Sequence, residues 1–289
     1  MATTKKGVRP QIQAVIDECL PKLRALGSGR CAVTIGGSHG KGTFDERSDL
    51  DFRVFCDEIV GAPRYRETEV WRAFARIVDH QRAQGINIDN CWVRTTGEIE
   101  SELAAWLNGR TLPVEMVWTL WGYHLLTDIA NQMVIDDPSG IVAGWQARLT
   151  PYPRALQRAV MEKHMGSLNY WRSDFHYRNK VERRDQVFLA GISSRLVHDM
   201  TQVLFAINNT YYVGDGNNLH YVEQFAVQPK DFASRVRTIL YPPQSGDALT
   251  AQYEMTMELI DELAPLAAEA KETGTVASKS GAGDVGQRA

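Results

Sequence analysis

The sequence predicts an α+β fold, in which an N-terminal domain with a mixed β-sheet flanked by helices precedes an all-α helical-bundle domain. Two patterns support this prediction. Strand and helix patterns alternate between about residues 10 and 140, as is typical of a sheet covered by helices. After Pro153 the strand patterns largely vanish and long helical patterns continue to Glu269. With 289 residues, 44% of them hydrophobic, the chain has the composition of an ordinary globular protein.

The change of pattern divides the chain into three predicted parts. The catalytic domain is expected to span residues 1–145, and the helical domain 146–273. The remaining segment, 274–289, is small, polar and free of aromatic residues. It has too little apolar surface to offset its ordering entropy, so a disordered tail is expected.

The first half begins with a helix. Apolar residues recur at helical spacing between Pro10 and Leu26, and "GSG" ends the segment. "CAVTI" is a short apolar run and "DLDFRVF" alternates polar with apolar residues, which predicts two strands, at 31–35 and 49–55. Further along, the patterns predict helices at 64–80 and 98–107 and strands at 86–95, 112–118 and 131–140.

The second half is predicted to contain long helices at 155–171, 185–208 and 248–268. Between Arg154 and Asp185, eight lysines and arginines stand against four acidic residues. Such an excess favours contact with an anion. Lys163 is the preferred candidate for a triphosphate contact, because His164 and Trp171 give its helix a face of mixed chemistry.

Charge and cysteine content narrow the classes of function. The formal net charge is -3 and the pI is about 6.2, so nothing in the overall charge favours DNA or an anionic membrane. We therefore expect a small-molecule substrate. The four cysteines form no C-x-x-C pair, and no stretch reaches the roughly 18 apolar residues of a membrane span. A cytoplasmic protein with free thiols is expected.

A glycine-rich loop occupies residues 35–54, "IGGSHGKGTFDERSDLDFRV". It is not a Walker A loop, because only three residues separate Gly36 from Gly40, and Gly42 follows Lys41 where a hydroxyl residue is required. A dinucleotide-binding loop is also excluded, since that loop opens a long helix. Here the chain instead reaches a second strand.

Two carboxylates define the chemistry of this strand. Because side chains alternate along a strand, Asp49 and Asp51 project to one face while Leu50 and Phe52 project to the other. Adjacent carboxylates raise each other's pKa unless a cation compensates for their charge. Mg²⁺ prefers oxygen ligands, so a magnesium site is predicted here.

"IGGS" followed by "SDLDFRV" resembles the signature of the polymerase-β-type nucleotidyltransferase superfamily. Within it the chain is most similar to the antibiotic nucleotidyltransferases, the aminoglycoside and lincosamide enzymes, which pair the catalytic domain with a helical one. The motif covers about residues 31–55. The resemblance implies transfer of a nucleoside monophosphate, AMP from ATP, to a hydroxyl of a small molecule, with release of pyrophosphate.

The family pattern also implies a third carboxylate on a later strand. Glu115 in "TLPVEMVW" is the first choice and Asp89 in "INIDNCWV" is the alternative. Asp49 and Asp51 would hold two magnesium ions roughly 3.5 to 4 Å apart. Glu115 would act as general base and touch a metal.

The glycine loop is assigned to the nucleotide. Gly36 and Gly37 would let the backbone approach the triphosphate, Ser38 would donate its hydroxyl to a phosphate oxygen, and Lys41 would add positive charge. In the helical half, Tyr211, Tyr212 and Asp199 are candidate acceptor contacts, and Trp118 and Trp121 are candidate pocket residues.

Several alternatives stay open. The same chemistry could act on a protein, a tRNA or a metabolite, and a non-catalytic nucleotide-binding module would share the fold. The preferred nucleobase is open, as is the choice between monomer and homodimer.

Overall fold

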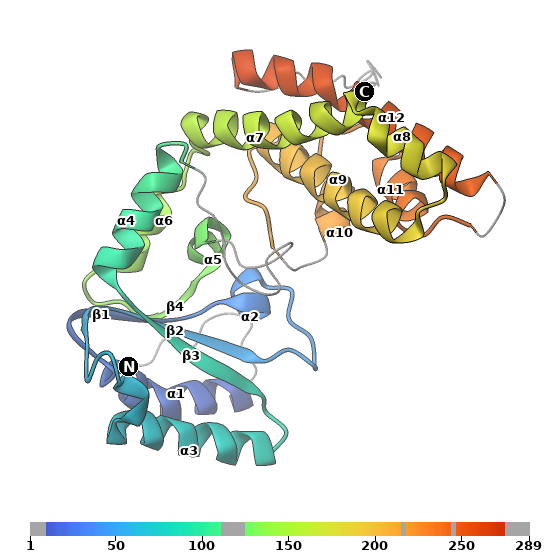
Figure 1. Cartoon of the computed structure of the whole chain (residues 1–289). Coiled ribbons are helices and arrows are strands. Elements are labelled where there is room, and N and C mark those ends of the chain that lie inside the picture. The colour runs from blue at the N-terminus through green and yellow to red at the C-terminus, as the bar shows by residue number, and fades with distance from the viewer. Residues whose placement is uncertain (1–9, 111–124, 215–217, 244–246, 275–289) are drawn as a thin grey trace, which may run out of the picture. The chain divides into compact units, whose positions relative to one another are not determined.

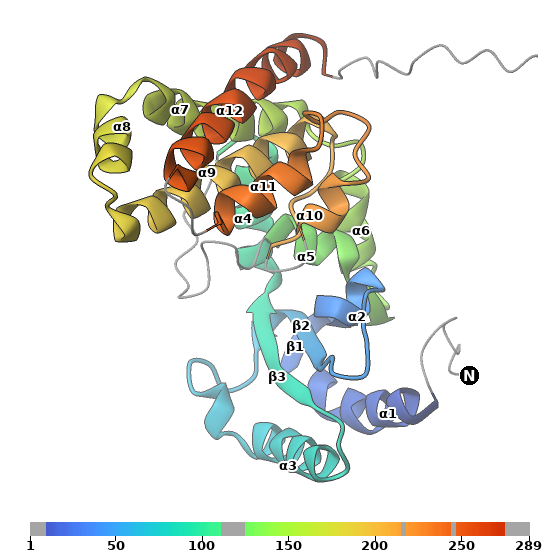
Figure 2. The same ribbon diagram turned by 90° about the vertical axis from the view of Figure 1, so that its right-hand side faces the viewer.

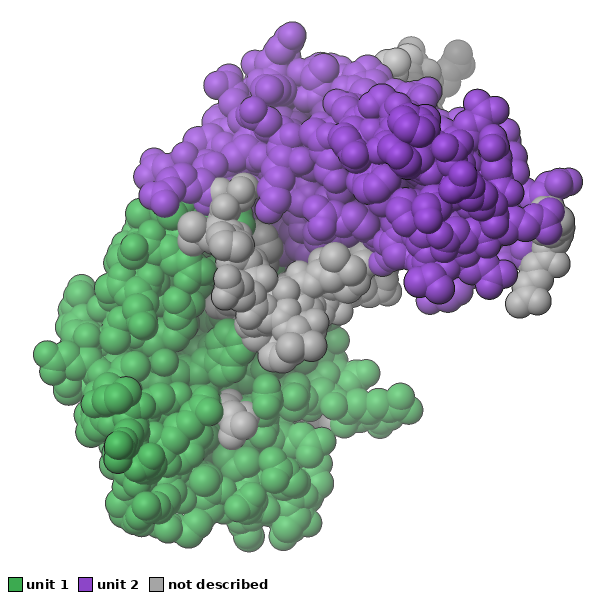
Figure 3. Space-filling view, viewed as in Figure 1, with its two compact units in different colours: residues 1–106, 125–151 green, residues 107–124, 152–289 purple. Residues whose placement is uncertain are grey.

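The computed structural model describes residues 10–110, 125–214, 218–243 and 247–274. The chain forms two compact units, residues 1–106 with 125–151 and residues 107–124 with 152–289 (Figure 3). The second unit thus resumes at Tyr152, six residues after the predicted boundary. The predicted strand at 112–118 and the predicted tail beyond Gly274 lie outside the described residues.

The first unit is built on a sheet whose described strands have the order β3-β2-β1-β4 (Figure 1). These strands are β1 (Gly27–Ile35), β2 (Leu50–Ile59), β3 (Ile88–Thr95) and β4 (Met133–Asp136). Strand β1 is antiparallel to β2 and to β4, whereas β2 and β3 are parallel. The sheet is therefore mixed, and the predicted α+β class is confirmed.

One face of this sheet is covered by α1 (Pro10–Arg24) and α3 (Glu69–Ala83), which lie side by side against it in both views (Figures 1 and 2). Helix α3 begins after a short 3-10 turn (Tyr65–Glu67), where the Thr68 hydroxyl caps the helix by accepting a hydrogen bond from the Trp71 amide at 3.2 Å. Phe74 of α3 packs edge-on against Phe52 of β2, with ring centroids 6.3 Å apart. The apolar positions of β2 are thereby used for the core.

The opposite face of the sheet carries shorter helices. These are α2 (Gly37–Lys41), α4 (Thr96–Leu107), α5 (Leu125–Asn131) and α6 (Ile141–Arg148). The Asp137 carboxylate caps α6 by accepting hydrogen bonds from the Ile141 and Val142 amides at 2.8 and 2.9 Å. Trp145 of α6 then packs edge-on against Phe55 of β2, 5.1 Å between centroids. This contact explains why α6 belongs to the sheet unit rather than to the helical one.

The second unit is helical throughout its described residues, which confirms the predicted all-α part. Its helices are α7 (Arg154–Ser173), α8 (Phe175–Glu182), α9 (Gln186–Ile207), α10 (Asn218–Val222), α11 (Phe232–Leu240) and α12 (Ala248–Thr273). Helices α7, α9 and α12 pack against one another and bury an apolar core. Within the described ranges, no helix combines the length and apolarity needed to cross a membrane.

Candidate functional site

Carboxylates gather on the face of the sheet that α1 and α3 leave uncovered. Asp51 on β2 is the register partner of Asp89 on β3, and register partners in a parallel pair project to the same face. Asp49 lies two residues before Asp51, separated from it by the buried Leu50. The strand pairing therefore sets Asp89 of β3 beside Asp51 of β2, while Asp49 directly precedes the first residue of β2.

The surroundings of the Asp51 carboxyl group disfavour its ionised form. Its side chain is only 17% exposed, and burial is the main reason why its pKa is raised to about 6. The Arg53 guanidinium opposes this shift, whereas the carboxylates of Asp49, Asp89 and Asp128 add to it.

The glycine loop lies directly on Asp51. The Gly36 amide donates a hydrogen bond to the Asp51 carbonyl at 2.9 Å. Gly37 has a φ of +58°, and a Cβ at this position would overlap Oδ2 of Asp51. Residue 37 is thus restricted to glycine by its backbone conformation and by the carboxylate beneath it. The sequence "GG" places main chain, with no side chain between, against the carboxylates.

The rest of the loop supplies a hydroxyl and a lysine. The Ser38 hydroxyl oxygen is buried, and no hydrogen-bond partner for it exists among the described residues. A buried polar group in this condition is costly unless a ligand satisfies it. Lys41 is half-buried at the end of α2. The ring of His39 stacks on Phe44 with centroids 4.5 Å apart.

Two residues of the site were missed by the sequence interpretation. Arg53 follows Asp51 by two positions on β2, so strand alternation was a signal that could have found it. Its side chain is 8% exposed, with Nη2 3.7 Å from Asp51 Oδ1 and Nε 3.5 Å from Asp128 Oδ2. Asp128 comes from α5, far along the chain, and no local pattern links it to the glycine loop.

The preferred third carboxylate, Glu115, lies outside the described residues, as do Trp118 and Trp121, so these assignments stay predictions. Asp89, the alternative, is the residue that the strand register sets beside Asp51.

The other predicted residues belong to the second unit. Lys163 is exposed on α7, Tyr211 is half-buried and Tyr212 is buried. Asp199 is fully buried on α9, where its carboxylate is held by the His164 ring at 2.6 Å and by Arg195 at 3.1 Å.

A histidine cluster surrounds this aspartate. His164, His198 and Asp199 offer ligand atoms that lie within 4.8 Å of one another. Burial raises the pKa of the Asp199 carboxyl group, but the hydrogen bonds from His164 and Ser167 and the charge of Arg195 outweigh burial, so the pKa is lowered. The guanidinium beside the carboxylate also disfavours a second cation. We interpret the contact between His164 and Asp199 as a buried hydrogen bond that joins α7 to α9.

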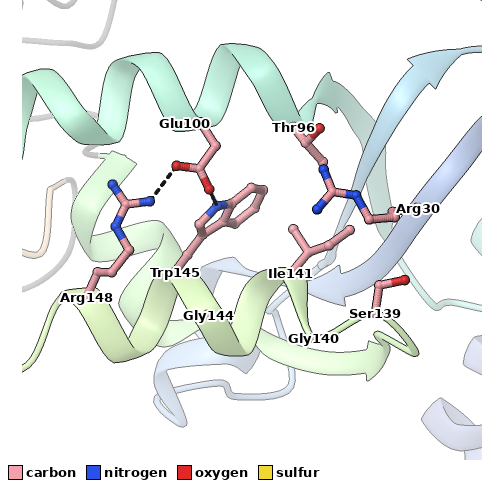
Figure 4. A pocket seen from close by; sticks show the side chains of 9 residues that line it. All are labelled: Arg30, Thr96, Glu100, Ser139, Gly140, Ile141, Gly144, Trp145 and Arg148. Carbon is pink, nitrogen blue, oxygen red and sulfur yellow. Dashed lines mark hydrogen bonds and ion pairs between the residues drawn. The ribbon is translucent and has the colours of Figure 1, made fainter.

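A separate cavity of about 240 Å³ lies in the first unit between α4 and α6 (Figure 4). Glu100 accepts hydrogen bonds there from the indole of Trp145 and from Arg148. Arg30, which also lines the cavity, is paired with Asp57 at 3.0 Å. Glu100 and Arg148 thus pair with each other, Arg30 pairs with Asp57 outside the lining, and none of the predicted site residues lines the cavity.

The carboxylates of Asp49, Asp51 and Asp89 are the type of ligand that Mg²⁺ prefers. Among the described residues, however, only His164, His198 and Asp199 bring three such ligand atoms within 4.8 Å of one another. A cation beside Asp51 would relieve the repulsion that raises the pKa of Asp51. The adjoining glycine backbone and the Ser38 hydroxyl are groups suited to phosphate oxygens.

Comparison with known proteins gives one partial match. A family model described only as a domain of unknown function (DUF4037) matches residues 118–215, that is 98 of the 289 residues. No curated protein matches the chain. The matched segment includes β4, α7 and α9, whereas Asp49, Asp51 and Asp89 precede it. The chain is therefore similar, over about a third of its length, to a domain family that carries no assigned activity.

Proposed function

We propose that this protein is a magnesium-dependent nucleotidyltransferase, which moves a nucleoside monophosphate, AMP from ATP, to a hydroxyl of a small molecule. One observation carries the proposal. Asp51 and its register partner Asp89 share a face of the sheet, Asp49 directly precedes it, and the main chain at Gly37 leaves no room for a Cβ over Asp51. This arrangement combines a hard-cation site with a phosphate-accepting loop.

Asp49, Asp51 and Asp89 are the proposed magnesium ligands. Asp89 is preferred here to Glu115 as the third carboxylate, because it is the register partner of Asp51 and contributes to the raised pKa of Asp51. Bound magnesium supplies positive charge to the phosphate oxygens and lowers the pKa of a coordinated hydroxyl. Whether one or two ions bind depends on the number of oxygens that remain accessible on Asp51.

The chain's own groups then account for binding and proton transfer. Gly36 and Gly37 let the main chain approach the triphosphate, and the Ser38 hydroxyl donates a hydrogen bond to a phosphate oxygen. The acceptor hydroxyl oxygen attacks the α-phosphorus while its proton passes to Asp89. The bond between the α-phosphorus and the bridging oxygen breaks, and pyrophosphate leaves with the electron pair.

The acceptor is proposed to be an aminoglycoside- or lincosamide-like compound in the cytoplasm. This part of the proposal depends on the resemblance of "IGGS" and "SDLDFRV" to the antibiotic enzymes. The small net charge of -3 supports a small molecule over a nucleic acid. In the helical unit, Lys163 stays the proposed triphosphate contact and Tyr211 the proposed acceptor contact, whereas Tyr212 is buried against Phe205.

The test incubates the purified chain with Mg²⁺, each of the four ribonucleoside triphosphates and a panel of aminoglycosides and lincosamides. The expected result is pyrophosphate release together with an acceptor mass gain of one nucleoside monophosphate. Asp51→Asn and Asp89→Asn should each reduce the rate by at least about 100-fold. Glu58→Gln, which changes an exposed carboxylate on the same strand, is the matched control.

Four outcomes would contradict the proposal or a part of it. Transfer by Asp51→Asn at the wild-type rate would exclude catalysis at this site. Absence of transfer with every nucleotide would favour a nucleotide-binding module, and transfer to a protein or tRNA instead of the panel would change the acceptor class. A large rate loss in Glu115→Gln but not in Asp89→Asn would return the third carboxylate to Glu115.

A further inference from the structure

The carboxamide of Gln132 lies against the glycine loop in a fixed orientation. Gln132 connects α5 to β4 and is only 5% exposed. The hydroxyl of Thr34 on β1 donates a hydrogen bond to Gln132 Oε1, and the main-chain carbonyl of Gln132 accepts another from Gln146 Nε2 of α6 at 3.1 Å. Both the main chain and the oxygen end of the amide are therefore held in place.

The nitrogen end of the same amide lies beside the loop. A Cβ added to Gly36 would be 3.0 Å from Gln132 Nε2, so the missing side chain at residue 36 lets the amide approach the main chain. The Nε2 group is buried and has no hydrogen-bond partner in the part of the chain that the structure describes. A buried donor in this condition is destabilising unless a ligand accepts its hydrogen.

A second buried donor belongs to the loop itself. The Ser38 hydroxyl, two residues beyond Gly36, also lacks a hydrogen-bond partner among the described residues. The carboxylate of Asp128 lies near Gly36 as well, but it is paired with Arg53 at 3.5 Å. Two uncharged donors at one glycine loop are suited to oxygen acceptors, and phosphate oxygens are strong acceptors of such hydrogen bonds.

We propose that Gln132 is a phosphate-binding residue, whose Nε2 group donates a hydrogen bond to a phosphate oxygen of a nucleoside triphosphate bound at Gly36 and Ser38. The inference rests on the nucleotide-binding part of the proposed function. Thr34 is a positioning residue, since its hydroxyl occupies Oε1 and thereby turns Nε2 towards the loop. The α5–β4 connection thus contributes a donor to a site that the glycine loop forms in part.

Three substitutions test the contact. Gln132→Met keeps the size of the side chain and removes the donor, so a nucleoside triphosphate should bind about tenfold more weakly. Gln132→Glu replaces the donor by a charged acceptor, so the loss should be larger still. Thr34→Val leaves the donor but not its fixed orientation, and a loss of about threefold is expected. If the amide served packing alone, these changes would alter stability and leave nucleotide affinity unchanged.

The experiment measures binding of ATP and, separately, of GTP to the full chain by isothermal titration calorimetry with excess Mg²⁺. Each variant should lose affinity for the two nucleotides by the same factor, because both carry the same triphosphate. Gln252→Met is the matched control: Gln252 is also 5% exposed, and its Nε2 donates to the Ile239 carbonyl within the helical unit. This control should leave both affinities unchanged.

Circular dichroism establishes that each variant is folded. Gln132→Met leaves the buried Thr34 hydroxyl without its acceptor. If this variant does not fold, the double variant Thr34→Val/Gln132→Met replaces it, because removing both partners of a buried hydrogen bond is nearly neutral for stability. The double variant should show the same loss of about tenfold in nucleotide affinity, with an unchanged or higher free energy of unfolding in the absence of nucleotide.

The inference is overturned if the wild type binds neither nucleotide, or if Gln132→Met and Gln132→Glu bind both as the wild type does. A loss confined to ATP would place the contact at the base and overturn it as well, and wild-type affinity in Thr34→Val would refute the positioning role of Thr34. These outcomes differ from failure of the proposed function. Weaker binding in the variants without transfer by the wild type would refute the transferase proposal alone, whereas transfer with unchanged affinities would refute the phosphate contact alone.

Discussion

Replacing Asp51 by asparagine is expected to stabilise the metal-free protein at neutral pH, although it removes a residue proposed to be essential for activity. The folded environment opposes ionisation of this carboxyl group, mainly through burial and also through Asp49, Asp89 and Asp128. Ionised Asp51 is therefore a cost to the metal-free fold. An amide of the same shape carries no charge and avoids that cost.

The size of the stability gain expected for Asp51→Asn follows from the Asp51 pKa. The Asp51 pKa rises from its ordinary value of 3.8 to about 6. At about 1.4 kcal/mol per unit of pKa, full conversion gives about 3 kcal/mol. The side chain retains 17% exposure, and solvent screening lowers the expected gain to about 1 to 2 kcal/mol.

The stability gained by Asp51→Asn depends on pH. Because the folded pKa of Asp51 is higher than the unfolded one, the folded state binds more protons between about pH 4 and pH 6. Wild-type stability is accordingly lost as the pH rises through this window. The gain from Asp51→Asn should be present at pH 7 and absent below pH 4, where the carboxyl group is protonated in both states.

The assay is urea unfolding in EDTA at pH 7 and at the lowest pH that keeps the protein folded. Asp57→Asn is the matched control on the same strand: the hydrogen bonds from Arg30, in the first place, lower the Asp57 pKa to about 2. That group contributes stability above its unfolded pKa, so its substitution should destabilise the protein at pH 7. Saturating Mn²⁺ should stabilise the wild type but not Asp51→Asn. The difference in free energy of unfolding between the two should therefore shrink or change sign. Loss of stability in Asp51→Asn at pH 7 in EDTA would refute the electrostatic reasoning.

Three further predictions concern the glycine loop and helix α3 on the other face of the sheet. Gly37→Ala should abolish Mn²⁺ binding in a titration of the free ion, because its Cβ would overlap the Asp51 carboxylate. Gly42→Ala is the control: its φ of +71° is similar but the space around it is open, so it should retain binding. Ser38→Ala should weaken nucleotide binding, measured by calorimetry, and leave the free energy of unfolding unchanged or higher, because the buried hydroxyl has no hydrogen-bond partner among the residues described. Thr68→Ala should lower the free energy of unfolding by about 1 kcal/mol through loss of the cap of α3, without changing Mn²⁺ affinity; a change in affinity would contradict the separation of that helix from the site.

The sequence by itself determined the features that depend on local periodicity. Alternation along a strand is a property of the backbone, so "DLDFRV" was enough to predict that Asp51 faces away from the core that Leu50 and Phe52 join. The predicted strand at 49–55 begins at Leu50, so Asp49 precedes it. The switch from strand to helix patterns near Pro153 was likewise enough to predict the α+β class. The same alternation carried a signal for Arg53, which was overlooked.

Only the tertiary structure decided which distant residues join Asp51. Asp89 reaches it through the parallel pairing of β2 with β3, and Asp128 through α5, which follows more than 70 residues later along the chain. The inclusion of α6 in the sheet unit depends in the same way on the packing of Trp145 against Phe55. Such contacts arise from strand register and helix packing between remote segments, and a short sequence window contains neither. The sequence could therefore name Asp51 and Asp89 as candidates, whereas their pairing across β2 and β3 and the contact of Arg53 with Asp128 depended on the folded chain.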